Sequence, residues 1–112
     1  MSNNKKNYPQ QRKELPSEIN NRGLLPPQAP DLEEAVLGVL MLEKDKFYEV
    51  NRVLPLPECF YKPDHVAIYK AIISLQRLGR PVDLLTVTAE LNKMGDLEKA
   101  GGAYNLTRLT MN

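Results

Sequence analysis

The two residues best suited to nucleophilic or metal chemistry lie close together in the sequence. Cys59 and His65 are the single cysteine and the single histidine of the chain. A nucleophilic site would also need a group that orients the histidine and a pocket for an oxyanion, and a metal site would need further ligands at suitable spacing. The sequence supplies neither. We therefore interpret Cys59 as a small buried residue in an apolar stretch, and His65 as a first-turn helix residue that interacts with its neighbours.

Charged side chains are the remaining candidates for chemistry. Glu33, Glu34 and Glu43 could act as catalytic carboxylates, but they fall on the polar side of a predicted helix, which is typical of solvated surface. Lys70 and Arg77 could contact nucleic-acid phosphates, but the sequence gives them no aromatic stacking partner. We favour a solvated stripe for these two cations.

The glycines do not form a phosphate-binding loop. Such a loop needs the pattern Gly-x4-Gly-Lys-Ser/Thr, in which backbone amides surround the phosphates, and none of the 6 glycines is followed by lysine. We predict no catalytic, cofactor or metal residues. The chain is thus expected to be a non-enzymatic binding module.

Size and charge favour one small domain behind a polar arm. The 112 residues are 42% hydrophobic, which suits one compact core. Residues 1–26 hold few apolar side chains and an excess of basic ones, so we predict a flexible basic arm there and a helical domain over 27–112. The remainder is slightly acidic, with 10 basic and 12 acidic residues. An apolar run of roughly 20 residues, as a membrane span needs, is not found, and the chain is expected in the cytoplasm.

Apolar spacing predicts an all-α bundle of about five short helices, because no segment alternates with period two. The helices are expected over residues 31–42 and 45–53, from 63 to a stop at Gly79, from a cap at Asp83 to a stop at Gly95, and after 101–102. Asp31 and Glu34 have the spacing of a capping box for the first of them.

The first predicted helix is apolar on two sides. Leu37 and Met41 lie opposite the main apolar series of this helix, beside Glu33 and Glu34. Two explanations stay open: the helix is wholly internal, or Leu37 and Met41 form an interface with a partner. Internal burial is the favoured alternative.

An ordered set of short motifs resembles the N-terminal domain of DnaB-type replicative helicases. The set comprises LPPQ at 25–28, DLEEAVLG at 31–38, Phe60-Tyr61, His65 with Ile68-Tyr69, LGRPVDLLT at 78–86 and GGAYNL at 101–106.

The resemblance implies a helicase head domain that is followed, beyond this chain, by a helical hairpin and an ATPase motor. It further implies self-association as a dimer within the collar of a hexamer, recruitment of primase, and unwinding of DNA at the replication fork. DNA contact, ATP and magnesium would belong to the motor. This chain would then be a non-catalytic assembly and partner-binding domain.

A second hypothesis is a small helical DNA-binding regulator that uses the basic arm to contact phosphates. The third predicted helix argues against it, because its many apolar positions leave little polar surface to read a groove.

Overall fold

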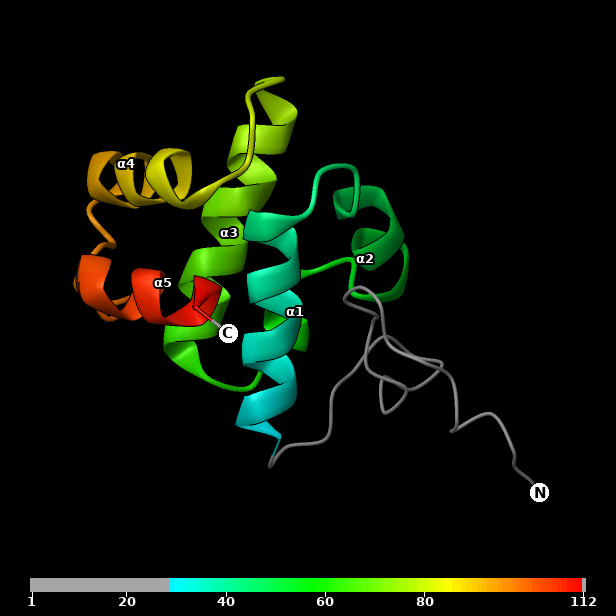
Figure 1. Cartoon of the computed structure of the whole chain (residues 1–112), viewed down its shortest axis with the longest axis horizontal. Coiled ribbons are helices and arrows are strands. Elements are labelled where there is room, and N and C mark those ends of the chain that lie inside the picture. The colour runs from blue at the N-terminus through cyan, green and yellow to red at the C-terminus, as the bar shows by residue number, and fades with distance from the viewer. Residues whose placement is uncertain (1–28, 112) are drawn as a thin grey trace.

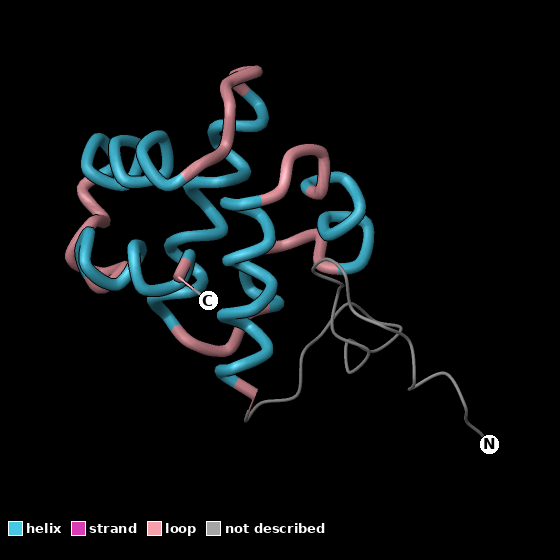
Figure 2. The backbone as a smooth tube through the Cα atoms, in the orientation of Figure 1, coloured by secondary structure: helices cyan, strands magenta, loops and turns pink. Residues whose placement is uncertain are grey.

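The structure, a computed structural model, describes residues 29–111. The expected arm over 1–26 therefore lies outside the described residues. The helical elements are α1 (Pro30–Leu42), α2 (Phe47–Val53), the 3-10 turn η2 (Pro57–Cys59), α3 (Pro63–Arg77), α4 (Leu84–Met94) and α5 (Gly102–Thr110). Helices and loops account for all of residues 29–111, as Figure 2 shows, which confirms the all-α class.

Helices α1 and α3 form the centre of the bundle (Figure 1). Helix α4 packs on α3, α5 packs on α1, and α4 and α5 contact each other, so this pair covers one side of the centre. Helix α2 lies on the other side. None of the helices in the described part of the chain has the length and apolar run that crossing a membrane requires.

Local stop and start signals around α4 behave as predicted. The Asp83 carboxylate accepts the Thr86 N–H at 2.9 Å, and the Thr86 hydroxyl accepts the Asp83 N–H at 2.9 Å, which completes a capping box. Gly95 ends the helix at φ 79°. Gly79, at φ 69°, likewise follows the last residues of α3.

Two predicted helix starts are wrong. Helix α1 begins at Pro30 with Ala29 as its N-cap, and Asp31 makes no capping bond. Proline outcompetes the aspartate because its φ is preset for the first helical position and it has no N–H to satisfy. Helix α2 begins at Phe47 instead of Asp45, because Asp45 takes a left-handed φ of 66° that a helix does not accept.

The core draws side chains from all five α-helices, and Tyr69 of α3 is one of its largest fully buried members. Its ring is fully buried beside Phe60, with ring centroids 5.0 Å apart. The Tyr69 hydroxyl donates to the Leu54 carbonyl at 2.7 Å and accepts from Asn51 Nδ2 at 3.0 Å. These bonds attach α2 and the loop after it to α3.

Gly38 allows α5 to approach α1 closely. A Cβ atom at this position would lie 2.7 Å from the Leu109 carbonyl oxygen. The glycine that is unfavourable for helix propensity is therefore required by packing.

Candidate functional site

A carboxylate and an imidazole form a buried pair between the first turns of α1 and α3. Glu33 Oε1 lies 2.6 Å from His65 Nδ1, and both side chains are fully buried. The remaining bonds of the carboxylate go to the backbone before α3: Glu33 accepts the N–H of Tyr61 at 2.5 Å and that of Lys62 at 3.3 Å. One side chain thus connects α1 to the entry of α3.

The position of Glu33 follows from the way α3 begins. The N-cap residue Lys62 offers no side-chain oxygen, and the proline after it has no N–H. Glu33 accepts the N–H groups of the two residues before the helix, Tyr61 and Lys62, and also places negative charge near the positive end of the α3 dipole. Its burial contradicts the predicted solvated position. His65 also differs from the prediction, since its main partner lies on another helix.

The Glu33–His65 pair resembles the base and orienting acid of a hydrolytic site, but it cannot reach a substrate. His65 Nε2 is buried and has no hydrogen-bond partner among the described residues. The nearest carboxylate oxygen, Oδ1 of Asp64, is 4.0 Å away. The Phe60 ring lies edge-on to the imidazole at 6.5 Å. With no accessible atom, the pair acts as a structural clamp.

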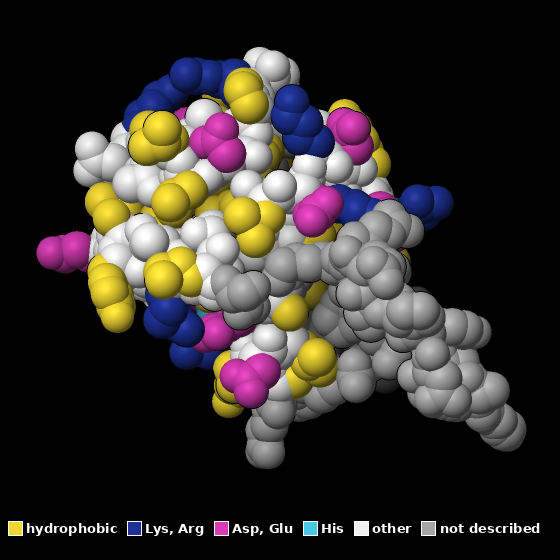
Figure 3. All heavy atoms as spheres, viewed as in Figure 1, with side chains coloured by type: hydrophobic (Ala, Val, Ile, Leu, Met, Phe, Trp, Pro, Cys, Tyr) yellow, Lys and Arg dark blue, Asp and Glu magenta, His cyan; other side chains and the backbone are white. Residues whose placement is uncertain are grey.

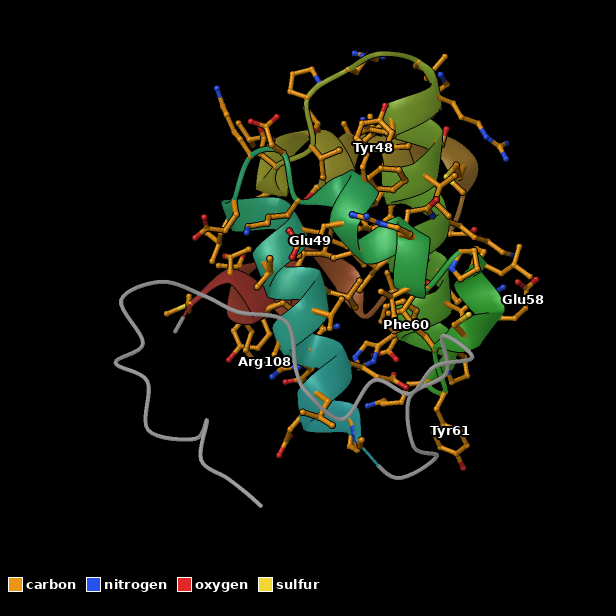
Figure 4. The ribbon with its side chains drawn as sticks, turned by 90° about the vertical axis from the view of Figure 1, so that its right-hand side faces the viewer. Tyr48, Glu49, Glu58, Phe60, Tyr61 and Arg108 are labelled. Atoms are coloured by element: carbon orange, nitrogen blue, oxygen red, sulfur yellow. The ribbon has the colours of Figure 1, made fainter. Side chains whose placement is uncertain are left out.

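Phe60 and Tyr61 are neighbours in the segment before α3, but their side chains point in different directions. Figure 4 shows Phe60 directed into the body and Tyr61 directed away from it. Phe60 is buried, whereas Tyr61 is exposed. Cys59 is half-buried against the core instead of fully buried. Between residues 29 and 111 no three His, Cys, Asp or Glu side chains are grouped as a metal site would need.

Glu34, in α1, and Glu43, just after it, are half-buried and therefore more exposed than Glu33. Glu34 forms a two-pronged ion pair with Arg108 of α5, with contacts of 3.2 and 2.9 Å. The guanidinium hydrogen bond lowers the pKa of Glu34, and the same bond raises the pKa of Arg108. Glu43 is half-buried after the end of α1. Glu34 and Glu43 are therefore not clustered as paired catalytic carboxylates would be.

Leu37 and Met41, the candidate interface residues, lie in the core of the single chain. Leu37 is fully buried and Met41 is 4% exposed. Helix α1 contacts α3, α4 and α5, so both of its apolar sides have neighbours within the chain. Internal packing accounts for the two-sided pattern without a partner.

Exposed apolar side chains lie elsewhere, at positions that were not predicted to be surface. The most exposed large ones are Tyr48, Leu56, Tyr61, Leu78, Leu85, Tyr104 and Met111. Helical spacing alone would have identified Leu85, which lies away from the inward positions Leu84, Val87 and Leu91.

Comparison with known proteins identifies relatives of the described domain. The family model described as "DnaB-like helicase N terminal domain" matches residues 25–112. A replicative DNA helicase DnaB from Rhodothermus marinus is 46% identical over 88 residues, which are 79% of this chain and 9% of that protein. The replicative DNA helicase DnaC of Bacillus subtilis is 43% identical over 89 residues, which are 80% of this chain and 19% of that protein.

A solved structure agrees with the fold. The crystal structure of the N-terminal domain of DnaB helicase from Mycobacterium tuberculosis has a TM-score of 0.71 and 42% sequence identity to this chain. The match covers 76% of this chain and 58% of that one. The chain spans less than a fifth of the curated relatives described above.

Proposed function

Because the chain belongs to the DnaB-like helicase N-terminal domain family, we propose that it is a non-catalytic assembly and partner-binding domain of a hexameric replicative DNA helicase. Its role would be to help build the ring and to recruit primase at the replication fork in the cytoplasm. The observation that supports this most is the family match over residues 25–112, together with the 42% identity to a solved domain of the same kind.

The chemistry of the whole protein is part of the proposal. The relatives are named replicative DNA helicases and are far longer than this chain. ATP and magnesium would be bound by a motor segment outside these residues, and DNA would be contacted there. The buried Glu33–His65 pair agrees with this division, because its atoms hold helices together and are closed to substrates.

Sedimentation velocity tests the binding role directly. The chain is measured at several concentrations, alone and with a primase fragment from the same source. We expect a faster-sedimenting species with primase. A chain that sediments identically with and without primase, at the highest attainable concentration, would contradict recruitment. Self-association is judged from the chain alone in the same experiment.

Two further measurements separate this proposal from its rivals. We expect no ATP hydrolysis by the isolated chain, and activity that follows the chain through several independent purification steps would contradict a non-catalytic role. Salt-dependent binding of duplex DNA by a chain that lacks residues 1–25 would instead favour the DNA-binding regulator.

A further inference from the structure

The end of α3 and the outer side of α4 border an open hollow of about 290 Å³. Its lining residues are Leu75, Arg80, Leu85, Thr86, Ala89, Glu90 and Lys93. Figure 3 shows Lys and Arg side chains gathered over the end of α3 and over α4, next to hydrophobic ones. Apolar and basic groups therefore share this surface.

The apolar part consists of two leucines that the core does not use. Leu85, in the first turn of α4, is 80% exposed, and Leu78, at the end of α3, is 54% exposed. Leu78 lies one turn beyond the buried Leu75, on the same side of the helix. Leu85 lines the hollow, whereas Leu78 is the C-cap residue of α3, the helix whose Leu75 also lines it.

The basic part consists of Arg77, Arg80 and Lys93. None of the three forms an ion pair with an acidic residue of the described part of the chain. Arg80 and Lys93 line the hollow. Arg77 does not line the hollow; it lies one turn beyond Ser74, whose hydroxyl donates to Glu90 of α4.

The acidic residues at this surface are already engaged. Glu90 is buried, with 6% of its residue surface exposed, and its carboxylate accepts the Ser74 hydroxyl at 2.7 Å. Asp83 caps α4 through the Thr86 N–H. These hydrogen bonds come from neutral groups, so both carboxylates keep their charge, and the three cations Arg77, Arg80 and Lys93 outnumber the two acids by one.

We propose that this surface, defined by Leu78, Leu85, Arg77, Arg80 and Lys93, docks an acidic amphipathic helix of a partner protein. The leucines of the partner's apolar face would contact Leu78 and Leu85, as in other helix-in-groove contacts. Its carboxylates would lie opposite the three cations, which steers the encounter and fixes the orientation.

Charge and side-chain type argue against two other occupants. A second copy placed face to face would bring two sets of cations together, which is unfavourable. Single-stranded nucleic acid is held by aromatic stacking as well as by cations, and no aromatic residue lines the hollow. The inference rests on the proposed partner-binding role and deepens it by naming a surface and the chemistry of its partner. The test below uses peptides without primase or ring assembly, so the two proposals can fail separately.

Two designed peptides test the proposal on the isolated chain. Both carry leucine at helical spacing, and the other positions hold glutamate in the first peptide and lysine in the second. Binding to the isotopically labelled chain is followed by NMR. We expect the acidic peptide alone to bind, with the largest amide shifts at residues 77–93. Equal binding of both peptides, or shifts confined to other residues, would overturn the proposal.

Charge reversal makes the test sharper. The double variant Arg80→Glu with Lys93→Glu is expected to bind the acidic peptide at least tenfold more weakly than the parent chain does. It should bind the basic peptide more tightly than the parent chain does. The matched control reverses two exposed lysines elsewhere, Lys44→Glu with Lys99→Glu, and should bind like the parent chain. A loss of binding that is equal in both double variants would show a general charge effect and overturn the site.

The leucine contact is tested separately. Leu85→Ser is expected to weaken the acidic peptide about tenfold, and Leu56→Ser, which changes another exposed leucine, should leave binding unchanged. Both side chains are exposed, so both variants should fold. Unchanged binding by Leu85→Ser would overturn the proposal, as would an oligonucleotide that binds the same residues more tightly than the peptide.

Discussion

Glu33 of α1 and His65 of α3 lie 32 residues apart in the sequence, yet their side chains meet at 2.6 Å in the interior. The same carboxylate also accepts two backbone N–H groups at the entry of α3. A buried carboxylate is tolerated only where such partners surround it. The pair therefore helps to fix the position of α1 against α3, in addition to the apolar core that the two helices share.

Removal of this carboxylate should destabilise the domain severely. Glu33→Ala leaves His65 and two N–H groups without their acceptor, and we expect a loss of about 3–5 kcal/mol in the free energy of unfolding. Glu33→Gln should cost less, because its amide oxygen still accepts. Urea unfolding gives the values, with Glu34→Ala as the matched control. A smaller loss for Glu33→Ala than for Glu34→Ala would contradict the clamp.

The Glu34–Arg108 pair should make a small contribution that depends on pH. Its groups are 26% and 46% exposed, so solvent screening limits the expected contribution to about 0.5 kcal/mol. The pKa of Glu34 is lowered from 4.5 by the Arg108 hydrogen bond. The contribution is accordingly complete above 4.5 and is lost as pH falls through the lowered pKa.

Unfolding of the parent chain and of Glu34→Gln over a pH series measures this contribution. The difference in the free energy of unfolding between the parent chain and Glu34→Gln should disappear at acidic pH. A difference that is constant from neutral pH to well below 4.5 would show that the ion pair is not its source.

The Tyr69 hydroxyl should contribute to the stability of the bundle, and this contribution should be lost at alkaline pH. Tyr69→Phe leaves the Leu54 carbonyl and the Asn51 amide without their partner, which should cost about 1–3 kcal/mol at neutral pH. Burial raises the pKa of Tyr69 above 10.0. The folded chain then holds a proton that the unfolded chain releases, so the contribution is lost as pH rises through the raised pKa.

Urea unfolding on either side of pH 10.0 tests this sign. The advantage of the parent chain over Tyr69→Phe should shrink in alkali. Tyr104→Phe is the control, because Tyr104 is 81% exposed and should change little at any pH. An advantage that grows with pH would contradict the burial of a neutral hydroxyl.

Helix boundaries set by local chemistry could be predicted from the sequence. Asp83 with Thr86 forms the α4 cap, and Gly79 and Gly95 take the left-handed conformations that the pattern implied. These signals act between near neighbours, so no tertiary knowledge is needed. Prediction failed where two local signals competed, as at the start of α1, where Pro30 takes the place expected for a cap at Asp31.

The buried pair could not be predicted from local chemistry, because the two partners lie on different helices. A signal did exist in the spacing. Glu33 stands four residues before Leu37 and eight before Met41, so it shares their side of α1. Once Leu37 and Met41 are internal, the same spacing makes Glu33 internal as well. The prediction that Glu33 is solvated was wrong, because its charge is typical of surface whereas its position on α1 places it inside.

Replacement of Gly38 by alanine should lower the stability of the domain, although alanine is the better helix former. In an open helix position the change from glycine to alanine stabilises by about 1 kcal/mol. Here the new Cβ would lie 2.7 Å from the Leu109 carbonyl oxygen, a backbone atom that moves only with α5. We expect a net loss of about 1–3 kcal/mol. Ala35→Gly, at an exposed position of the same helix, measures by urea unfolding the difference in helix propensity between alanine and glycine. Stabilisation by Gly38→Ala would contradict the close approach.

Met41 and Leu42 distinguish core from interface at adjacent positions. Met41 is 4% exposed and Leu42 is 48% exposed, although both end the same helix. Met41→Glu would bury an unpaired carboxylate among apolar side chains, so we expect it to destabilise the monomer by several kcal/mol, of order 3 or more, or to prevent folding. Leu42→Glu should change stability by about 0.5 kcal/mol or less.

Circular dichroism with urea, combined with sedimentation, decides between the two explanations for this stripe. If Met41→Glu folds with parental stability but self-associates less, Met41 is an interface residue and its burial within one chain is contradicted. If Met41→Glu unfolds while Leu42→Glu does not, α1 is internal on both sides. In that case contacts between copies of the chain must use surfaces other than the one marked by Leu37 and Met41.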